Sequence, residues 1–398
     1  MLDKLYESFL RRLDILQDST MRSIAKDIDW SNRILYIRGA RGVGKTTLLL
    51  QYIKNNFSLN EEVLYISLDD IVFSEISLLE LADKFCKNNG KYLFVDEIHK
   101  YPNWAQELKN IYDSYPSLKI VFTGSSSLKI HQGQVDLSRR VVEYKMPGLS
   151  FREFLNYTHT FFLNPITLYE LLTNHIEISS TVNKKIKPLV EFKKYCKYGY
   201  YPFFMENIRS YNQKLNNIVN LVLESDIPIS NELKTQHIVK IKKLLYVIAN
   251  SVPFKPNIVK LSEKLEISRN TVLMYLDFLE KAEIIHLLYP PVTSLGFLTK
   301  PDKIYLNNSN LNHVLSQELK DLGNVRETFF MNQLSVKHKV NYTETGDFLV
   351  DKKYTFEVGG KNKTTQQIRR IPNSYIASDE IEYGYKNRIP LWLMGFLY

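Results

Sequence analysis

Cysteine is scarce in this sequence, and long uncharged apolar runs are missing. The 398 residues include two cysteines, too few for a disulfide scaffold, and Cys86 and Cys196 fit no metal-ligand spacing. The longest apolar stretch, residues 389–398, is too short to cross a bilayer. Charged residues interrupt the N-terminal segment where a signal peptide would have an uncharged core. We therefore expect a soluble, cytoplasmic protein with no membrane partner.

The composition is that of a globular protein with a basic balance. Hydrophobic residues make up 44% and charged residues 24%, which excludes a disordered or fibrous chain. Lysine and arginine number 52 against 43 acids, a net charge of +9 that suits phosphate-rich partners without identifying one. A chain of this length is expected to form several domains.

Short apolar runs alternate with polar stretches long enough to be helices, and this alternation predicts an α/β fold with a mostly parallel sheet. The runs are residues 34–37, 63–68, 92–95 and 120–122, with a weaker fifth at 141–144. Helical spacing without strands follows, and proline-containing breaks at 252–256 and 290–291 separate two further segments. The predicted domains are an N-terminal helix (1–30), a P-loop core (31–150), a helical region (151–250), a winged-helix-like domain (251–295) and a small α/β domain (296–398).

A phosphate-binding motif follows the first predicted strand. Residues 39–46 match G-x-x-x-x-G-K-[ST] in full. The glycines allow a tight turn whose N–H groups face a β-phosphate, and the next helix places its positive end at the same point. Lys45 is expected to bridge the β- and γ-phosphates, and Thr46 to contribute its hydroxyl to Mg²⁺. The expected nucleotide-binding residues are Gly39, Ala40, Arg41, Gly42, Val43, Gly44, Lys45, Thr46 and Thr47.

Two acids at the end of another buried run complete this site. Asp96 and Glu97 follow residues 92–95 directly. Asp96 is expected to hold Mg²⁺ through water, together with Thr46. Glu97 is expected to orient and polarise the attacking water, which is the feature of a hydrolytic site rather than a transfer site.

Two further positions are candidates for the same chemistry. Ser125 is the first choice, and Thr123 the second, for a hydroxyl that reaches the γ-phosphate or the water, while a plain turn or helix cap is the alternative. Arg139, before the last predicted strand, is a candidate arginine finger, which would stabilise the transition-state charge on the nucleotide of a neighbouring subunit. Its alternative is a solvated basic face.

These residues carry a family resemblance. The sequence resembles prokaryotic AAA-type ATPases that pair a P-loop domain with an uncharacterised C-terminal domain. The matching segments are residues 37–47, 96–104, 122–126 and 149–154, with a looser match at 199–202. In such proteins the arginine that precedes the last strand usually follows a glycine, whereas Arg139 of this chain follows Ser138. The resemblance implies ATP and Mg²⁺ as cofactors, and a sheet in which the Ser125 strand lies between those of Lys45 and Asp96.

Residues 258–276 are predicted to form a helix, a tight turn and a second helix, followed by the start of a wing at 282–285. Arg269 and Asn270 lie at the start of the second helix, where base contacts are made in DNA-binding examples. Asp277 and Glu280 lie further along and would repel phosphate if they faced it. DNA binding and a structural or protein-docking role both remain open.

Three acids in the C-terminal segment resemble the Mg²⁺ site of restriction-endonuclease-like folds. They are Glu327 on a predicted helix and Asp347 and Glu357 on neighbouring predicted strands. The lysine of that pattern belongs two residues after the second strand acid, where this chain has Gly359. Lys361 is the candidate replacement, displaced by about 6–7 Å along the strand unless the glycines bulge. A nuclease-like fold without cleavage activity is the alternative.

Three functional hypotheses follow. The leading one is a Mg²⁺-dependent ATPase that converts ATP to ADP and phosphate. The second is an ATP-gated nuclease or DNA-associated protein that uses the C-terminal acids. The third is a non-hydrolysing nucleotide switch that docks a protein partner. A finger role for Arg139 on a neighbouring nucleotide would require a homo-oligomer, and the alternatives are a role within one chain or no role.

Overall fold

The structure is a computed structural model. It describes residues 2–16, 20–126, 137–159, 162–231, 233–251, 255–291, 300–316, 322–364 and 366–398. The chain divides into two compact units, Met1–Gly148 and Leu149–Tyr398. The division falls at the predicted end of the P-loop core, and each unit is described by itself.

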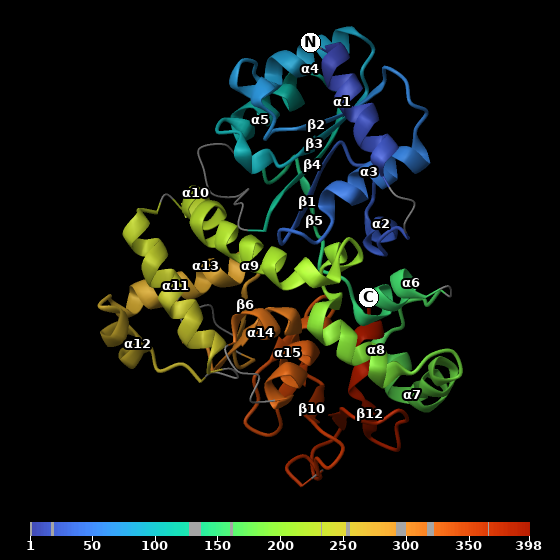
Figure 1. Cartoon of the computed structure of the whole chain (residues 1–398), viewed down its shortest axis with the longest axis vertical. Helices are drawn as coiled ribbons and strands as arrows, with labels where there is room; N and C mark the ends of the chain where they lie inside the picture. The colour runs from blue at the N-terminus through green and yellow to red at the C-terminus, as the bar shows by residue number, and fades with distance from the viewer. Residues whose placement is uncertain are drawn as a thin grey trace. The chain divides into compact units, whose positions relative to one another are not determined.

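The first unit is built on a parallel sheet. Within the described residues its strands are β1 (Ile34–Gly39), β2 (Val63–Ser67), β3 (Tyr92–Asp96), β4 (Lys119–Ser125) and β5 (Val142–Lys145). Their order is β2-β3-β4-β1-β5, and every neighbouring pair is parallel (Figure 1). β4 thus lies between β1 and β3, the arrangement that the family resemblance implies. The carboxyl ends of these three strands consequently meet at one edge of the sheet.

Helices and short 3-10 turns connect the strands of the first unit. They are α1 (Leu2–Ile15), α2 (Ile24–Asp27), α3 (Lys45–Asn56), η1 (Ile71–Ser74), α4 (Leu78–Lys87), η2 (Ile98–Lys100) and α5 (Trp104–Ser114). α1 buries Leu5, Phe9 and Leu13, one residue per turn, and packs against β2 and α3. Two helices therefore occupy the predicted N-terminal helix of residues 1–30. β2 is buried along its whole length, as expected of a strand covered on both faces.

The second unit begins with helices. They are α6 (Phe151–Thr158), α7 (Leu168–Asn183), α8 (Pro188–Lys194), α9 (Tyr211–Leu221), α10 (Ile227–Asn231) and α11 (Thr235–Ala249). Two π-helical turns, η3 (Tyr195–Gly199) and η6 (Val222–Asp226), and two 3-10 turns, η4 (Pro202–Met205) and η5 (Ile208–Ser210), connect them. These elements occupy the predicted helical region of residues 151–250.

Two more helices and a strand pair follow. α12 (Ile258–Leu265) and α13 (Arg269–Lys281) pack against each other, and α11 contacts α12. β6 (Ile285–Leu288) then pairs antiparallel with β7 (Lys303–Leu306). The predicted border between residues 295 and 296 lies outside the described residues. Because β7 follows that border and β6 precedes it, the strand pair joins the two domains that the sequence separated.

A second sheet forms the end of the chain. Its elements are α14 (Ser309–Leu315), α15 (Leu322–Leu334), β8 (Val340–Asn341), β9 (Phe348–Val350), β10 (Tyr354–Gly359), β11 (Ser374–Ser378), β12 (Arg388–Pro390) and η7 (Leu391–Phe396). The strand order is β12-β11-β10-β9-β8, antiparallel from β8 to β10 and parallel from β10 to β12. α15 packs against β10 and η7. None of the helices in the described ranges combines the length and apolar character of a membrane span.

Candidate active site

The loop between β1 and α3 has the backbone that phosphate binding needs. Gly42 and Gly44 have φ angles of 85° and 96°, in the left-handed region that favours glycine. α3 begins directly after Gly44, so its free N–H groups open into the loop. Gly39 packs so closely that a Cβ there would lie 2.3 Å from the Met146 carbonyl oxygen. The sequence thus builds a concave, positively polarised backbone at the end of β1.

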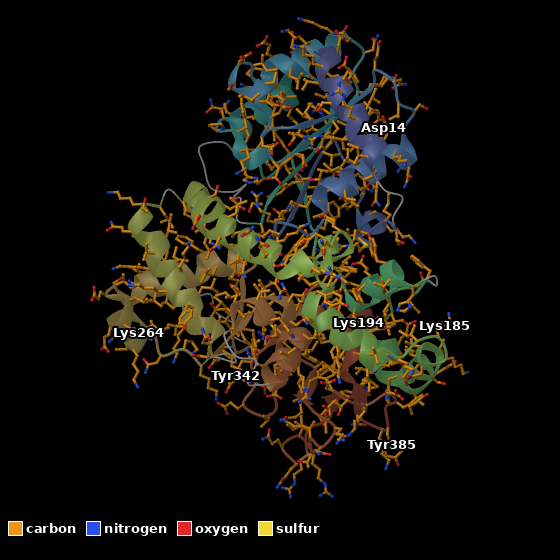
Figure 2. All side chains as sticks on the ribbon, in the orientation of Figure 1. Asp14, Lys185, Lys194, Lys264, Tyr342 and Tyr385 are labelled. Carbon is orange, nitrogen blue, oxygen red and sulfur yellow. The ribbon has the colours of Figure 1, made fainter. Side chains whose placement is uncertain are left out.

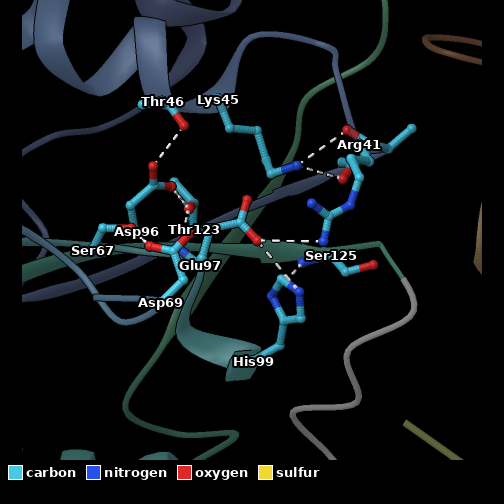
Figure 3. Close-up of polar contacts among 12 residues, drawn as sticks. Arg41, Lys45, Thr46, Ser67, Asp69, Asp96, Glu97, His99, Thr123 and Ser125 are labelled. Carbon is cyan, nitrogen blue, oxygen red and sulfur yellow. Dashed lines mark hydrogen bonds and ion pairs between the residues drawn. The ribbon is translucent and has the colours of Figure 1, made fainter. Parts of the chain in front are cut away.

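Two cations stabilise this loop from inside. The Lys45 ammonium donates to the carbonyl oxygens of Gly39 and Ala40, at 2.8 and 3.1 Å (Figure 3). The buried Arg22 guanidinium donates to the Val43 carbonyl at 2.9 Å and to the carbonyls of residues 147 and 148 at 2.8 and 2.9 Å. Arg22 therefore ties the loop to the chain that follows β5.

Asp96 is the centre of a hydrogen-bond network at the end of β3. The Thr46 hydroxyl donates to its Oδ2 at 2.5 Å, and the Thr123 hydroxyl donates to its Oδ1 (Figure 3). The Tyr65 hydroxyl also donates to Oδ2, at 2.8 Å. Burial, and then the Asp96 carboxylate, raise the pKa of the Tyr65 phenol, so this hydroxyl stays protonated. Thr46 and Asp96 place two hard oxygen donors beside the loop, and such donors suit Mg²⁺.

Glu97 has an unusual backbone and a polar environment. Its φ and ψ of 53° and 41° lie in the left-handed region, and its N–H donates to the Thr123 hydroxyl at 3.2 Å. The carboxylate Oε2 lies 3.8 Å from the Arg41 guanidinium of the loop and 3.4 Å from His99 Nε2. This conformation turns Glu97 off the strand axis, and its side chain remains partly exposed.

A second group of charges lies within the Leu149–Tyr398 unit. The Lys303 ammonium of β7 lies 3.4 Å from Glu327 of α15 and 3.7 Å from Asp347, which just precedes β9. The Lys363 ammonium lies 2.6 Å from the fully buried Glu357 of β10 and 3.8 Å from Asp347. The structure therefore brings the three predicted acids together and adds two lysines.

Burial governs the titration of these C-terminal acids. Desolvation, and then the Asp347 charge, raise the pKa of Glu327, although Lys303 and the Tyr305 hydroxyl oppose the shift. Burial also raises the pKa of Glu357, against the opposing effect of Lys363. Burial lowers the pKa of Lys363, but its pairing with Glu357 and Asp347 outweighs burial and leaves this pKa raised. The described part of the chain holds no cluster of three or more acid, histidine or cysteine ligands arranged for a metal ion.

Residues 31–155 match the model of a family described as AAA domain. Together with the parallel sheet and the glycine loop, this match decides the nature of the first unit. It is an AAA-type P-loop domain. Residues 189–327 match a domain of unknown function (DUF8612).

Two relatives and two solved structures are also similar to this chain. An uncharacterized protein of Methanocaldococcus jannaschii is 30% identical over 292 residues, which cover 70% of this chain and 60% of that protein. An uncharacterized protein of Haemophilus influenzae is 23% identical over 381 residues, 88% of each chain. AMPPCP-bound DnaA from Aquifex aeolicus and PCH-2 of C. elegans match with TM-scores of 0.24 and 0.23 and identities of 17% and 14%. The matches cover 69% and 45% of this chain, and 86% and 47% of those structures.

The AAA domain brings some of its predicted residues together and separates others. Ser125 lies buried at the end of β4, where its backbone N–H donates to His99 Nδ1 at 3.4 Å. Thr123, the second choice, is the residue whose hydroxyl reaches both Asp96 and Glu97. Arg139 is exposed in the turn before β5.

The structure brings Lys363, and not the predicted Lys361, to the C-terminal acids, and it shows contacts of the AAA domain that the sequence did not indicate. Lys361 is exposed in the turn after β10, and Lys363 is the residue whose ammonium reaches Glu357. Arg22 and Tyr65 carried no signal, because their partners lie far away in the sequence, and the contact of His99 with Ser125 was hidden for the same reason. Fold-level contacts of this kind leave no local motif.

Proposed function

We propose that this protein binds ATP with Mg²⁺ and hydrolyses it to ADP and phosphate. The observation that carries the proposal is the convergence at one sheet edge of the glycine loop, the Thr46–Asp96 pair and Glu97. A loop that only bound phosphate would need no carboxylate beyond Asp96. Glu97 supplies a base beside the loop, at the position from which water can be directed at a γ-phosphate.

Each side chain has a distinct role in this proposal. Lys45 exchanges the Gly39 and Ala40 carbonyls for phosphate oxygens when nucleotide binds, and these two hydrogen bonds orient its ammonium beforehand. Glu97 accepts a hydrogen bond from water and orients it. The water oxygen forms a bond to the γ-phosphorus as the bond to the β–γ bridging oxygen breaks, which leaves ADP and inorganic phosphate. Thr46 and Asp96 hold Mg²⁺, which neutralises phosphate charge when it is bound.

Phosphate release from ATP tests this proposal. We expect Lys45→Ala to lose tight ATP binding and Glu97→Gln to keep binding while its turnover falls by about 100-fold or more. Lys54→Ala, an exposed position on the same helix α3, is the matched control and should turn over at the native rate. Equal rates in the native chain, Lys45→Ala and Glu97→Gln would reject the proposal.

We further propose that Arg139 acts on the nucleotide of a neighbouring copy of this chain. The observation that supports this proposal is the exposed position of Arg139 in the turn before β5. Mixing Arg139→Ala with Lys45→Ala tests the role, because a mixed oligomer pairs an intact loop with an intact arginine. We expect the mixture to exceed the summed rates of the two variants. Native turnover by Arg139→Ala alone would identify a solvated basic face.

A second candidate function is Mg²⁺-dependent cleavage of nucleic acid by the C-terminal unit. The favouring observation is that the Lys363 ammonium lies 2.6 Å from Glu357 and 3.8 Å from Asp347, so a lysine is present at the acids although Gly359 stands at the usual lysine position. Two carboxylates, Asp347 and Glu357, suffice for Mg²⁺ when waters and substrate phosphates complete its shell. Lys363 lies where an ammonium would assist a reacting water or phosphate oxygen. A nuclease-like fold without cleavage activity is the alternative.

Metal-dependent cutting of single- and double-stranded DNA and RNA separates these alternatives. We expect Asp347→Ala, Glu357→Gln and Lys363→Met to abolish cleavage, and Lys361→Met to retain it as the matched control. Cleavage that survives Asp347→Ala and Glu357→Gln would reject the site. No cutting by the native chain, with folding intact, would support the inactive fold.

We propose that the segment α11 to β7 is a winged helix. Arg269 and Asn270 are exposed at the start of α13, and Lys264 of α12 extends to solvent (Figure 2). Asp277 is paired with Lys281 at 2.7 Å, which reduces its repulsion of phosphate. A gel shift with and without ATP tests DNA binding through this helix. Salt-sensitive binding that Arg269→Ala weakens supports it, and no binding favours a protein-docking role.

A further inference from the structure

His99 lies between the catalytic glutamate and the end of β4. It is on the short turn η2, two residues after Glu97, and its side chain is 4% exposed. Its Nδ1 accepts a hydrogen bond from the Ser125 N–H at 3.4 Å, and its Nε2 lies 3.4 Å from Glu97 Oε2 (Figure 3). One imidazole thus contacts both Glu97, two residues before it, and Ser125, which lies 26 residues further along the chain.

The backbone contact determines how this imidazole faces Glu97. A ring nitrogen that accepts a hydrogen bond carries no hydrogen, so Nδ1 of His99 is unprotonated. In the neutral ring the hydrogen is then on Nε2, the nitrogen that faces the carboxylate. Ser125 therefore selects the tautomer that presents a donor to Glu97. Ser125 thus orients the imidazole, and the imidazole in turn orients the Glu97 carboxylate, as a third group orients the base in a catalytic triad.

We propose that His99 is a positioning residue that couples the end of β4 to the orientation of Glu97. Ser125 lies at the carboxyl end of β4, the same sheet edge as the nucleotide loop. A displacement of that end when nucleotide binds is transmitted through the imidazole to the Glu97 carboxylate. The inference rests on the proposed ATP hydrolysis and names a residue for which neither the motif nor the family match gives a role.

The Arg41 guanidinium also lies near Glu97, but its position makes it a poorer candidate for this role than His99. Its guanidinium is 3.8 Å from the carboxylate and belongs to the nucleotide loop. Bound phosphate would compete for that guanidinium, because an arginine binds phosphate oxygens strongly. His99 belongs to the turn η2 that follows Glu97, and this turn packs against β4. It can therefore keep its contact with Glu97 when the loop is filled.

Two substitutions at His99 separate its two contacts. The amide nitrogen of glutamine lies as many bonds from Cβ as Nε2 of histidine, so His99→Gln keeps a donor toward Glu97. The amide oxygen of asparagine corresponds in the same way to Nδ1, so His99→Asn keeps the acceptor for Ser125 and loses the donor. Steady-state ATP hydrolysis by the full chain, with ATP affinity measured separately by calorimetry, is the experiment.

We expect His99→Asn to lower kcat by about 10- to 100-fold with little change in ATP affinity, because misplacing a reacting group by about 1 Å costs on this order. His99→Gln should recover most of that loss, and Lys100→Ala, on the same turn, should keep the native kcat. Equal kcat for His99→Asn and the native chain would overturn the inference. Equal loss in both His99 variants, together with a lowered denaturation midpoint, would overturn it in favour of a purely structural role. Absence of turnover in the native chain would instead reject the proposed hydrolysis.

Discussion

Thr123 connects Asp96 and Glu97, the two acids at the end of β3, through one hydroxyl. That hydroxyl donates to Asp96 Oδ1 and accepts from the Glu97 N–H at 3.2 Å, and the residue is fully buried. Thr123→Val keeps the shape of the side chain and removes both hydrogen bonds. The left-handed backbone of Glu97 would then lose one of the contacts that hold it.

The magnitude follows from the two lost bonds. A hydrogen bond to a charged group contributes about 1.5–3 kcal/mol, and leaving a buried donor without its partner costs about 1–3 kcal/mol. The extra methyl group of valine offsets about 0.8 kcal/mol of this loss. We therefore expect Thr123→Val to lower the free energy of unfolding of the first unit by about 2–5 kcal/mol.

Thr123→Ser is the matched control, because it keeps the hydroxyl and removes a methyl group at a cost of about 1 kcal/mol. Urea unfolding of the full chain, with hydrogen exchange of peptides from β3 and β4, locates the effect in the first unit. We also expect Thr123→Val to reduce ATP turnover more than Thr123→Ser. A valine variant as stable as the native chain would refute the reasoning that the hydroxyl stabilises both acids.

Three further expectations concern other parts of the chain. Arg22→Met should lower the free energy of unfolding by about 2–4 kcal/mol and weaken ATP binding, since the Val43 carbonyl loses its donor. Urea denaturation and calorimetry are the measurements, and native stability and affinity would contradict this expectation. Gly39→Ala should reduce ATP affinity at least tenfold, because its Cβ would lie 2.3 Å from the Met146 carbonyl oxygen, and native affinity would contradict that clash. Burial lowers the pKa of His175, so the unfolded state takes up protons first; the stability of the second unit should fall as the pH drops below about 6.5, and His175→Gln should show a shallower dependence.

The nucleotide loop could be recognised in the sequence because its chemistry is local. Phosphate binding by backbone N–H groups requires glycines, a lysine and a helix start within a few consecutive residues. The acids were also predictable, since each follows a buried strand directly. The parallel strand order that brings Asp96 beside Thr46 came from the family resemblance rather than from the spacing of the runs.

Other features depended on backbone geometry that no local pattern encodes. The sequence favoured Ser125 over Thr123, but the register of β4 against β3 places the Thr123 hydroxyl at the acids. Strand alternation pointed to Lys361, yet β10 ends at Gly359 and the chain turns, so Lys363 comes back toward Glu357. His99 was visible as a residue beside the acids, but its contact with Ser125 required the fold.

ATP retention and phosphate release by Glu97→Gln test the central claim most directly. The substitution removes the carboxylate and leaves the loop, Lys45 and the Thr46–Asp96 pair intact. We expect this variant to bind ATP as tightly as the native chain and to release phosphate at about one hundredth of the native rate or less. Phosphate release at the native rate, with ATP bound, would contradict the assignment of Glu97 and with it the proposed hydrolytic site.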